Sequence, residues 1–389
     1  TAYRRQRQMC IRDRHHTVPL YASPGTARQL AYGLAGVEPL LRPRDPGTEF
    51  CIGSCRVTAF ATSGSSGSPP KAILFTRRAL DVCARGALEH LHAECGDWCC
   101  PLPVWHVGGA MIYLRAALAG TAVHALHGRW NPQAYADLMK SSGACWSSLV
   151  PTQVVDLVNL RLRAPSTAGC IIVGGGALDM ETGRKARALG WPVVQSYGMT
   201  ESGSQLATAF PGDPYHTDRL SLLPHWETKT DEDGLLRFQG EGKLCGRLLT
   251  QPHGGFLLER VEPQEWWSTR DLVRLEGRLL TFLRRADRLV KVLGELVDPD
   301  AVQDALRRRV PDAVVEAVPH PRAGMELVAC GPAAVPLERA CREWNAAAPG
   351  PQRIRAVMET PIPLTVMGKL DRRRLRALLE ECPEKLREV

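Results

Sequence analysis

The sequence predicts an α/β protein: a large N-terminal domain of parallel α/β sheets with a β-rich subdomain, then a small α+β C-terminal domain. Three observations support this. From residue 51, short apolar runs alternate with helical patterns, which is typical of a parallel sheet. After residue 215, short strands such as "GLLRFQGEG" are separated by glycine turns. From residue 288, strands and helices form a separate compact pattern.

The elements of the larger domain follow one another in a regular order. "CRVTAFAT" and "KAILFT" are predicted strands, followed by the helix "RRALDVCARGALEHLHA". Strands in "DWCC", "TAVHAL", "ACWSSLV", "AGCIIV" and "PVVQSY" come next. Between them lie the helix "NPQAYADLMKSSG", with Asn131 as its N-cap and Pro132 at its first position, and the helix "METGRKARALG" with Gly190 as its C-cap.

Five loops of this domain follow predicted strands. Ligands of parallel α/β sheets bind beyond the carboxyl ends of the strands, so we expect these loops to converge on one edge. They begin near Gly64, His106, Pro151, Gly174 and Tyr197. "ACWSSLVPTQ" is expected to end in such a loop, and Asp271 is expected to precede a strand.

The C-terminal pattern begins with the helix "DPDAVQDALRRRV", capped by Asp298 with Pro299 at its first position. The strands "DAVVEAVPH" and "MELVACG", the helix "PLERACREWNAA" and the strand "RIRAVMET" follow. The helix "DRRRLRALLEE", capped by Asp371, closes the chain.

Composition limits the classes of function. The 389 residues are 44% hydrophobic and 23% charged, as in a globular protein. The net charge of +8 comes from arginines interleaved with acids, so we expect no nucleic-acid partner. An odd number of cysteines, 13, without a signal peptide predicts reduced thiols and a cytoplasmic location. No apolar run approaches the ~20 residues of a membrane span.

The first residues, "TAYRRQRQMCIRDRHH", are basic and have no apolar period. They resemble translated sequencing-adapter sequence, so we expect residues 1–16 to be a non-native tail and the domain to be truncated at its start. A native polybasic tail is the alternative.

The stretch "FATSGSSGSPPKAI" has two interpretations, a flexible linker or a phosphate-binding loop. Backbone N–H groups, small hydroxyls and a cation bind phosphates, and glycine lets the backbone approach closely. The two flanking strands argue against a linker, although the pattern is not a Walker A loop. The candidate residues are Thr62, Ser63, Gly64, Ser65, Ser66, Gly67 and Lys71.

Other stretches carry weaker signals. In "SYGMTES", Tyr197 is suited to stacking on a base, Thr200 offers a hydroxyl, and Glu201 offers a carboxylate for Mg²⁺. "STRDLVRLEG", "LRRADRLVKVLGE" and "PLTVMGKLDRR" alone fit solvated turns. A zinc site is disfavoured because separated Cys-x-x-Cys pairs are absent; its candidate ligands are His90, His92, Cys95, Cys99 and Cys100.

The order of these motifs resembles the adenylate-forming superfamily of acyl-CoA synthetases, luciferases and peptide-synthetase adenylation domains, over residues ~55 to 380. The resemblance implies ATP, Mg²⁺ and coenzyme A as substrates or cofactors. It also implies domains at residues 17–283 and 288–389, joined by a hinge at 284–287, with the smaller one acting as a mobile lid.

The resemblance also implies roles for the matched residues. The loop from Thr62 to Lys71 would hold the β- and γ-phosphates, Thr200 would contact the α-phosphate, and Glu201 would hold Mg²⁺. Lys369 would bridge the acyl carboxylate and the α-phosphate, and Gly294 would face the thioester-forming site. Adenine would lie against Gly174, Gly175, Gly176, Ala177, Tyr197 and Gly198; Asp271 and Arg285 would bind the ribose, and Asp287 would be the hinge residue.

A narrower likeness links "PLPVWHVGG", "SSLVPTQ" and "QSYGMTESGSQ" to o-succinylbenzoate–CoA ligases of menaquinone biosynthesis. It implies that His106 acts at the acyl pocket, whose further residues would be Gly109, Val150, Thr152, Gln153 and Ser204. The alternatives are another aryl- or medium-chain acyl-CoA ligase and a catalytically impaired nucleotide-binding relative. A homodimer is also expected.

Several positions depart from the superfamily pattern. The loop has an additional proline before Lys71, and Ser66 stands where threonine is usual. Arginine replaces glycine at Arg270 and Arg284, and Glu295 follows Gly294 where a second glycine is usual. These departures are the reason for keeping a catalytically impaired relative among the alternatives.

Overall fold

The computed structural model describes residues 8–13, 17–21, 48–52, 55–62, 71–250, 256–365 and 370–389. The chain divides into two compact units. The first comprises Thr1–Thr269 and Arg274–Phe282, and the second comprises Arg270–Val273 and Leu283–Val389.

The centre of the first unit is a parallel sheet in the order β10–β9–β8–β6–β7. These strands are β6 (Trp98–Cys100), β7 (Val123–Ala125), β8 (Trp146–Leu149), β9 (Cys170–Val173) and β10 (Val193–Tyr197). β6, β8, β9 and β10 are short and almost wholly buried because helices cover both faces of the sheet, whereas β7, at its edge, is half-buried. The predicted parallel α/β architecture is confirmed.

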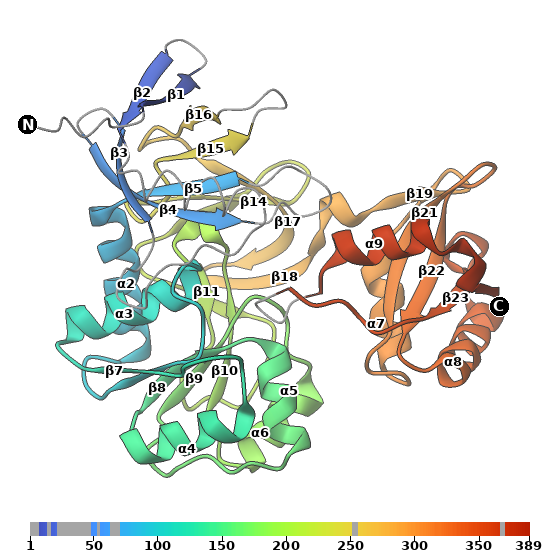
Figure 1. Ribbon diagram of the computed structural model, residues 1–389, viewed down its shortest axis with the longest axis horizontal. Coiled ribbons are helices and arrows are strands. Elements are labelled where there is room, and N and C mark those ends of the chain that lie inside the picture. The colour runs from blue at the N-terminus through green and yellow to red at the C-terminus, as the bar shows by residue number, and fades with distance from the viewer. Residues whose placement is uncertain are drawn as a thin grey trace, which may run out of the picture. The chain divides into compact units, whose positions relative to one another are not determined.

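The two faces of this sheet carry different helices (Figure 1). On one face lie α4 (Pro132–Ser142), α5 (Pro151–Asn159) and α6 (Met180–Ala188). Tyr135, Val154 and Trp191 pack there against Ile171 and Val173 of β9. On the other face, α2 (Arg77–Leu91) and α3 (Val107–Ala119) pack against each other, and α3 contacts β6 and β8.

Antiparallel strands extend the sheet beyond β10, giving the order β13–β14–β17–β18–β12–β11. Their bounds are β11 (Ala207–Thr208), β12 (Leu220–Leu222), β13 (Glu227–Thr230), β14 (Leu235–Gln239), β17 (Trp267–Glu276) and β18 (Leu279–Arg285). These strands form the predicted β-rich part. Asp271 lies within β17 and not before a strand, because β17 already begins at Trp267.

A closed barrel has the strand order β1–β16–β15–β5–β4–β3–β2. Its strands are β1 (Gln8–Asp13), β2 (Thr17–Tyr21), β3 (Thr48–Ile52), β4 (Cys55–Thr62), β5 (Lys71–Thr76), β15 (Gly246–Thr250) and β16 (Phe256–Arg260). β1 falls within residues 1–16, for which we expected no regular element. It pairs with β2 through backbone groups, which form a ladder without an apolar side-chain pattern.

The second unit is built on the sheet β20–β19–β22–β23–β24, in which β21 also pairs with β22. Its strands are β19 (Val290–Val292), β20 (Glu295–Val297), β21 (Val314–His320), β22 (Gly324–Gly331), β23 (Ile354–Glu359) and β24 (Leu386–Glu388). Its helices are α7 (Pro299–Arg307), α8 (Ala334–Ala347) and α9 (Arg372–Glu381). The sheet separates a core with α7 and α8 from a smaller core with α9.

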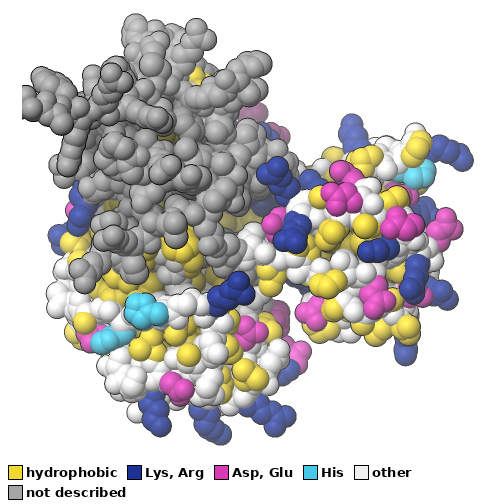
Figure 2. Space-filling model, viewed as in Figure 1, with side chains coloured by type: hydrophobic (Ala, Val, Ile, Leu, Met, Phe, Trp, Pro, Cys, Tyr) yellow, Lys and Arg dark blue, Asp and Glu magenta, His cyan; other side chains and the backbone are white. Residues whose placement is uncertain are grey.

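Acidic and basic side chains intermingle on the face of the second unit that Figure 2 shows. Among the described residues, every helix is too short or too polar to cross a membrane. Within those same residues, no group of three or more histidine, cysteine or acidic side chains could hold a metal ion. Of the residues considered as zinc ligands, His90 Nε2 contacts the carbonyl oxygen of Thr208 at 2.9 Å, and the Cys99 and Cys100 side chains are buried.

Candidate functional site

The Gly/Ser stretch connects two paired strands of the barrel. Thr62 ends β4 and lies opposite Lys71, which begins β5, and Thr62 Oγ1 donates to the Lys71 carbonyl oxygen at 3.4 Å. The connection therefore starts and returns at neighbouring positions, as a hairpin loop does and an interdomain linker does not. Ser63, Gly64, Ser65, Ser66 and Gly67 lie outside the described residues.

The barrel location corrects one expectation. Gly64 was expected in a loop of the parallel sheet, but it follows β4, which is antiparallel to both of its neighbours. The other four loops do follow β6, β8, β9 and β10, which run parallel, so they leave the same edge of the sheet.

An ion pair joins the hairpin to the loop after β10. Lys71 Nζ lies 2.8 Å from Glu201 Oε1, and the two side chains are 27% and 14% exposed. Glu201 belongs to the 3-10 turn η2 (Thr200–Ser202), and its carbonyl oxygen accepts a hydrogen bond from Leu244 N at 3.2 Å. Two stretches 130 residues apart in the chain thus place a cation and a carboxylate side by side.

The loop after β10 is folded tightly on itself. A Cβ atom at Gly198 would lie 1.8 Å from the Ser204 carbonyl oxygen, so only glycine fits there. Ser202 Oγ donates to Met199 O at 3.0 Å and accepts from Met199 N at 3.2 Å, which closes the turn that carries Thr200 and Glu201. These contacts fix the backbone of the turn.

Tyr197, at the end of β10, has an aromatic neighbour. Its ring lies 5.8 Å from the Phe282 ring, centre to centre, at an interplanar angle of 30°. Both residues belong to the first unit. The Tyr197 ring is therefore packed on one side in this structure.

The three-glycine loop after β9 is held by a residue that sequence reasoning missed. Gln195 is 5% exposed; its Nε2 donates to Gly176 O at 3.0 Å and its Oε1 accepts from Leu178 N at 3.0 Å. Gly175 has φ +80°, and Gly175, Gly176 and Ala177 are exposed. The position of this glutamine within the predicted strand "VVQSY", between apolar residues, is the signal by which it could have been found from the sequence.

Two further loops leave the same edge at helix N-termini. His106 occupies the N-cap position of α3, and a Cβ atom at Gly109 would lie 2.2 Å from the Pro103 carbonyl oxygen, so this close approach requires glycine. Val150 is the N-cap residue of α5, and its N–H donates to Gln153 Oε1 at 2.9 Å. Thr152 lies in the first turn of α5.

A buried polar network supports the loop after β10 from behind. Arg115 is 1% exposed, and its guanidinium donates to Gln205 Oε1 and lies 5.7 Å from the centre of the Trp98 ring. Gln205 Nε2 donates to Thr208 Oγ1 at 2.7 Å. Burial lowers the pKa of Arg115 to about 10, so this side chain remains charged at neutral pH. Sequence reasoning gave Arg115 no role.

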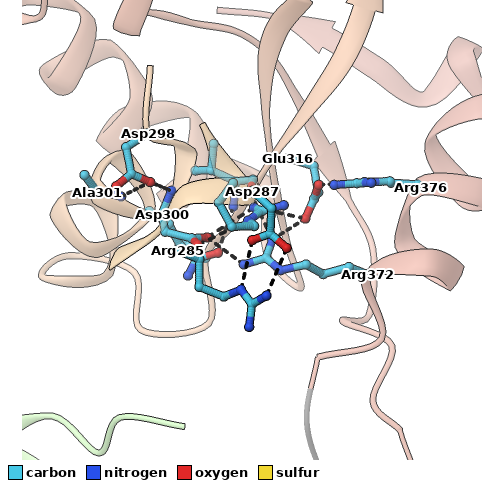
Figure 3. A network of polar contacts seen from close by, with 12 residues as sticks. Arg285, Asp287, Asp298, Asp300, Ala301, Glu316, Arg372 and Arg376 are labelled. Carbon is cyan, nitrogen blue, oxygen red and sulfur yellow. Dashed lines mark hydrogen bonds and ion pairs between the residues drawn. The ribbon is translucent and has the colours of Figure 1, made fainter. Parts of the chain in front are cut away.

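In the second unit, Arg285 joins two carboxylates. Its Nε and Nη2 each lie 2.9 Å from an oxygen of Asp287, a bidentate pair shown in Figure 3. Its Nη1 lies 3.5 Å from Asp271 Oδ1, and Asp271 is 5% exposed. The hydrogen bonds from Arg285 outweigh burial and lower the pKa of Asp287.

Two other predicted positions lie elsewhere in this unit. Leu293 and Gly294 form a two-residue hairpin turn between β19 and β20, with φ of 53° and 86°, as in a type I′ turn. Lys369 lies outside the described residues. On either side of the undescribed segment, Leu364 and Leu370 form an antiparallel bridge.

A carboxylate for Mg²⁺ is present in the first unit. Mg²⁺ is usually held in proteins by one or two carboxylates together with substrate phosphates. Glu201, partly exposed on a fixed turn beside Lys71, matches this requirement. The residues therefore fit a metal ion that is shared with a phosphate chain.

Comparison with known proteins gives consistent matches. Residues 57–247 match the family described as AMP-binding enzyme. The 2-succinylbenzoate–CoA ligase of Escherichia coli K12 is 31% identical over 244 residues, 62% of this chain and 50% of that protein. The corresponding enzyme of Listeria monocytogenes serotype 4b is 25% identical over 328 residues, 81% of this chain and 68% of that protein.

Solved structures show the same fold. Bacillus subtilis o-succinylbenzoate coenzyme A synthetase (MenE), in complex with ATP and magnesium, aligns with a TM-score of 0.67 at 24% identity over 82% of this chain and 69% of that one. ATP-bound MatB from Rhodopseudomonas palustris aligns with a TM-score of 0.69 at 19% identity over 89% and 72%. The chain spans about half the length of most curated relatives that it matches, 50% for the E. coli enzyme.

Proposed function

We propose that this chain, whose residues 57–247 match the family of AMP-binding enzymes, is an ATP-dependent acid–CoA ligase. The contact between Lys71 and Glu201, at 2.8 Å, carries the proposal. It joins the hairpin proposed to bind phosphates to the turn proposed to bind Mg²⁺. A phosphate chain with a bound metal needs both charges within a few ångströms of one another.

The proposed reaction has two steps. A carboxylate oxygen of the acid attacks the α-phosphorus of ATP, the bond to pyrophosphate breaks, and an acyl-adenylate forms. The thiolate of coenzyme A then attacks the acyl carbonyl carbon, and AMP leaves. The first step brings two anions together, so the site must supply positive charge and hydrogen-bond donors.

The first unit would supply most of these groups. Lys71 and the backbone of the hairpin loop hold the β- and γ-phosphates, and the Thr200 hydroxyl donates to the α-phosphate. Mg²⁺, when bound, offsets the negative charge of the phosphates. Glu201 would hold that ion, which requires Lys71 to exchange its carboxylate partner for a phosphate oxygen. The exposed backbone of Gly174–Ala177 and the ring of Tyr197 would receive the adenine.

The second unit would supply the remaining polar groups. Asp271 would accept hydrogen bonds from the ribose hydroxyls, with Arg285 beside it. Lys369 would bridge the acid and the α-phosphate in the first step. Rotation at Asp287 would then withdraw that lysine and bring Gly294 to the thioester-forming site.

We propose o-succinylbenzoate as the acid and menaquinone biosynthesis as the pathway. Support comes from curated relatives that are 2-succinylbenzoate–CoA ligases, among them those of Listeria monocytogenes and Escherichia coli. His106, at the N-terminus of α3, would face the acid, with Gly109, Val150, Thr152, Gln153 and Ser204 as the surrounding acyl pocket. We place the enzyme in the cytoplasm, as a homodimer. The buried free thiols of Cys83 and Cys170 agree with a reducing compartment.

A substrate panel tests the proposal. The full chain is incubated with ATP, Mg²⁺ and one carboxylic acid at a time, with and without coenzyme A, and pyrophosphate and AMP are measured. We expect o-succinylbenzoate to give pyrophosphate, and AMP release to require coenzyme A. If only another acid is turned over, that acid is the substrate in place of o-succinylbenzoate. ATP binding without pyrophosphate release would indicate a catalytically impaired relative.

A further inference from the structure

The second unit contains a fully buried carboxylate that no predicted role uses. Glu316 lies on β21, and its side chain is 0% exposed. Arg376 Nε approaches one carboxylate oxygen at 3.0 Å, and Arg288 Nη2 lies 3.5 Å from the other, which also accepts from Arg372 (Figure 3). A buried charge needs partners of this kind, because its desolvation is costly.

Asp300, at the N-terminus of α7, completes the cluster. Arg288 donates to both of its carboxylate oxygens at 3.1 Å, and Arg372 Nη2 donates to Oδ1 at 2.7 Å. Arg288 and Arg372 therefore each contact both acids. Without the charge of Glu316, Arg288 and Arg372 would share the single carboxylate of Asp300, and Arg376 would lose the carboxylate that it contacts.

The cluster reaches the proposed ribose-binding pair through a short turn. Arg288 ends the 3-10 turn η3 (Ala286–Arg288), which also contains Asp287 and directly follows Arg285. Arg285 contacts Asp287 at 2.9 Å and Asp271 at 3.5 Å. The backbone of this turn thus connects the Glu316 cluster, at Arg288, to the contacts that Arg285 makes with Asp287 and Asp271.

We propose that Glu316 is a positioning residue for nucleotide binding. It fixes Arg288, so that the turn holds Arg285 against Asp271 with the Asp271 carboxylate aimed at the ribose hydroxyls. The proposal rests on the proposed function, because it assigns the ribose to Asp271. It predicts a defect in ribose recognition specifically, and not a uniform loss of activity.

The test compares ATP with 2′,3′-dideoxy-ATP in acid-dependent ATP–pyrophosphate exchange by the full chain. Hydrogen bonds from two hydroxyls to a carboxylate should make ATP preferred by about a hundredfold in kcat/KM. In Glu316→Gln we expect this preference to fall about tenfold, and Glu316→Asp should retain more of it. In an Asp271→Asn background, Glu316→Gln should have no further effect on the preference.

Glu343→Gln is the matched control. Glu343 also pairs with two arginines, Arg309 at 2.8 Å and Arg339 at 3.1 Å, but its side chain is 41% exposed on α8. We expect this variant to keep the wild-type preference. An unchanged preference in folded Glu316→Gln, or an equal loss with both nucleotides, would overturn the positioning role.

Two further measurements keep the outcome decisive. If Glu316→Gln does not fold, the variant Arg288→Lys is measured in its place. Lysine keeps the positive charge but lacks the planar guanidinium group with which Arg288 contacts both acids. We expect the same fall in the preference for ATP over 2′,3′-dideoxy-ATP. If the wild type shows no exchange, the proposed reaction fails, and the ratio of the two nucleotide affinities, measured by calorimetry, decides the positioning role. Absence of any nucleotide binding would overturn both.

Discussion

The ion pair between Lys71 and Glu201 should stabilise the nucleotide-free protein and lose this effect when Mg²⁺ and ATP bind. At 2.8 Å and an effective dielectric constant of about 20, the Coulomb attraction is at most ~6 kcal/mol. Ordering and partly desolvating two side chains that are 27% and 14% exposed reduces this to about 1–2 kcal/mol. With substrate bound, each residue would face a phosphate or the metal instead.

A double-mutant cycle of Lys71→Met and Glu201→Gln measures this coupling from urea unfolding, with and without Mg²⁺–ATP. We expect a coupling free energy of about 1–2 kcal/mol without Mg²⁺–ATP and of less than ~0.5 kcal/mol with it. The pair Arg78–Glu241, at 2.9 Å with side chains 78% and 63% exposed, is the control and should couple weakly in both conditions. Coupling that is absent without substrate, or equal in both conditions, would refute the exchange of partners.

Three further predictions concern other parts of the chain. Lys369→Ala should lose adenylate formation yet convert supplied acyl-adenylate and coenzyme A to thioester; equal loss of both half-reactions would contradict the two-step role. Gly198→Ala should lower the free energy of unfolding by about 1–3 kcal/mol, since its Cβ would meet the Ser204 carbonyl oxygen at 1.8 Å; an unchanged melting temperature would contradict it. Burial, with a smaller effect of the Arg278 charge, lowers the pKa of His225 from 6.5 to about 4. As the pH falls from 6.5 to 4, His225 therefore gains a proton in the unfolded chain but not in the folded one. The free energy of unfolding should thus fall by up to ~3 kcal/mol as the pH is lowered over that interval. His225→Phe should remove this slope in urea unfolding, and a slope that persists would assign the effect to other groups.

The strands and their loops were readable from the sequence because buried parallel strands form short continuous apolar runs. The stretches "AGCIIVGGG" and "PVVQSYGMT" each predicted a strand and the loop that follows it. Helix caps were equally local: Asn131 accepts from Ala134 N and Asp371 from Arg374 N, as predicted. These features depend on neighbours in the chain.

Two helices were not predicted, for physical reasons. α3 is buried on most sides, so its sequence "VGGAMIYLRAALA" has no polar face and no helical period. α5 has only nine residues and starts at Pro151, which we interpreted as part of a loop. The helix α6 ends one residue earlier than expected, with Leu189 as its C-cap and Gly190 in the left-handed conformation after it.

The contacts that define the candidate site could not be predicted from local pattern. The approach of Lys71 to Glu201 depends on how the barrel packs beside the parallel sheet. Likewise, nothing in the strand "DAVVEAVPH" indicates that Glu316 meets three arginines from distant segments. The order of the motifs predicted which residues are candidates for the site, whereas the partners of those residues depend on tertiary packing.

The division of the chain has a consequence for dissecting the protein. The second unit includes Arg270–Val273, which is separated from Leu283–Val389 by a stretch assigned to the first unit. A fragment that starts at Leu283 would leave Asp271 behind, and Arg285 would lose that carboxylate partner. The smaller unit therefore cannot be excised as one uninterrupted peptide that begins at Leu283, and a complementation experiment with two fragments would separate Asp271 from Arg285, the pair that we propose for ribose binding.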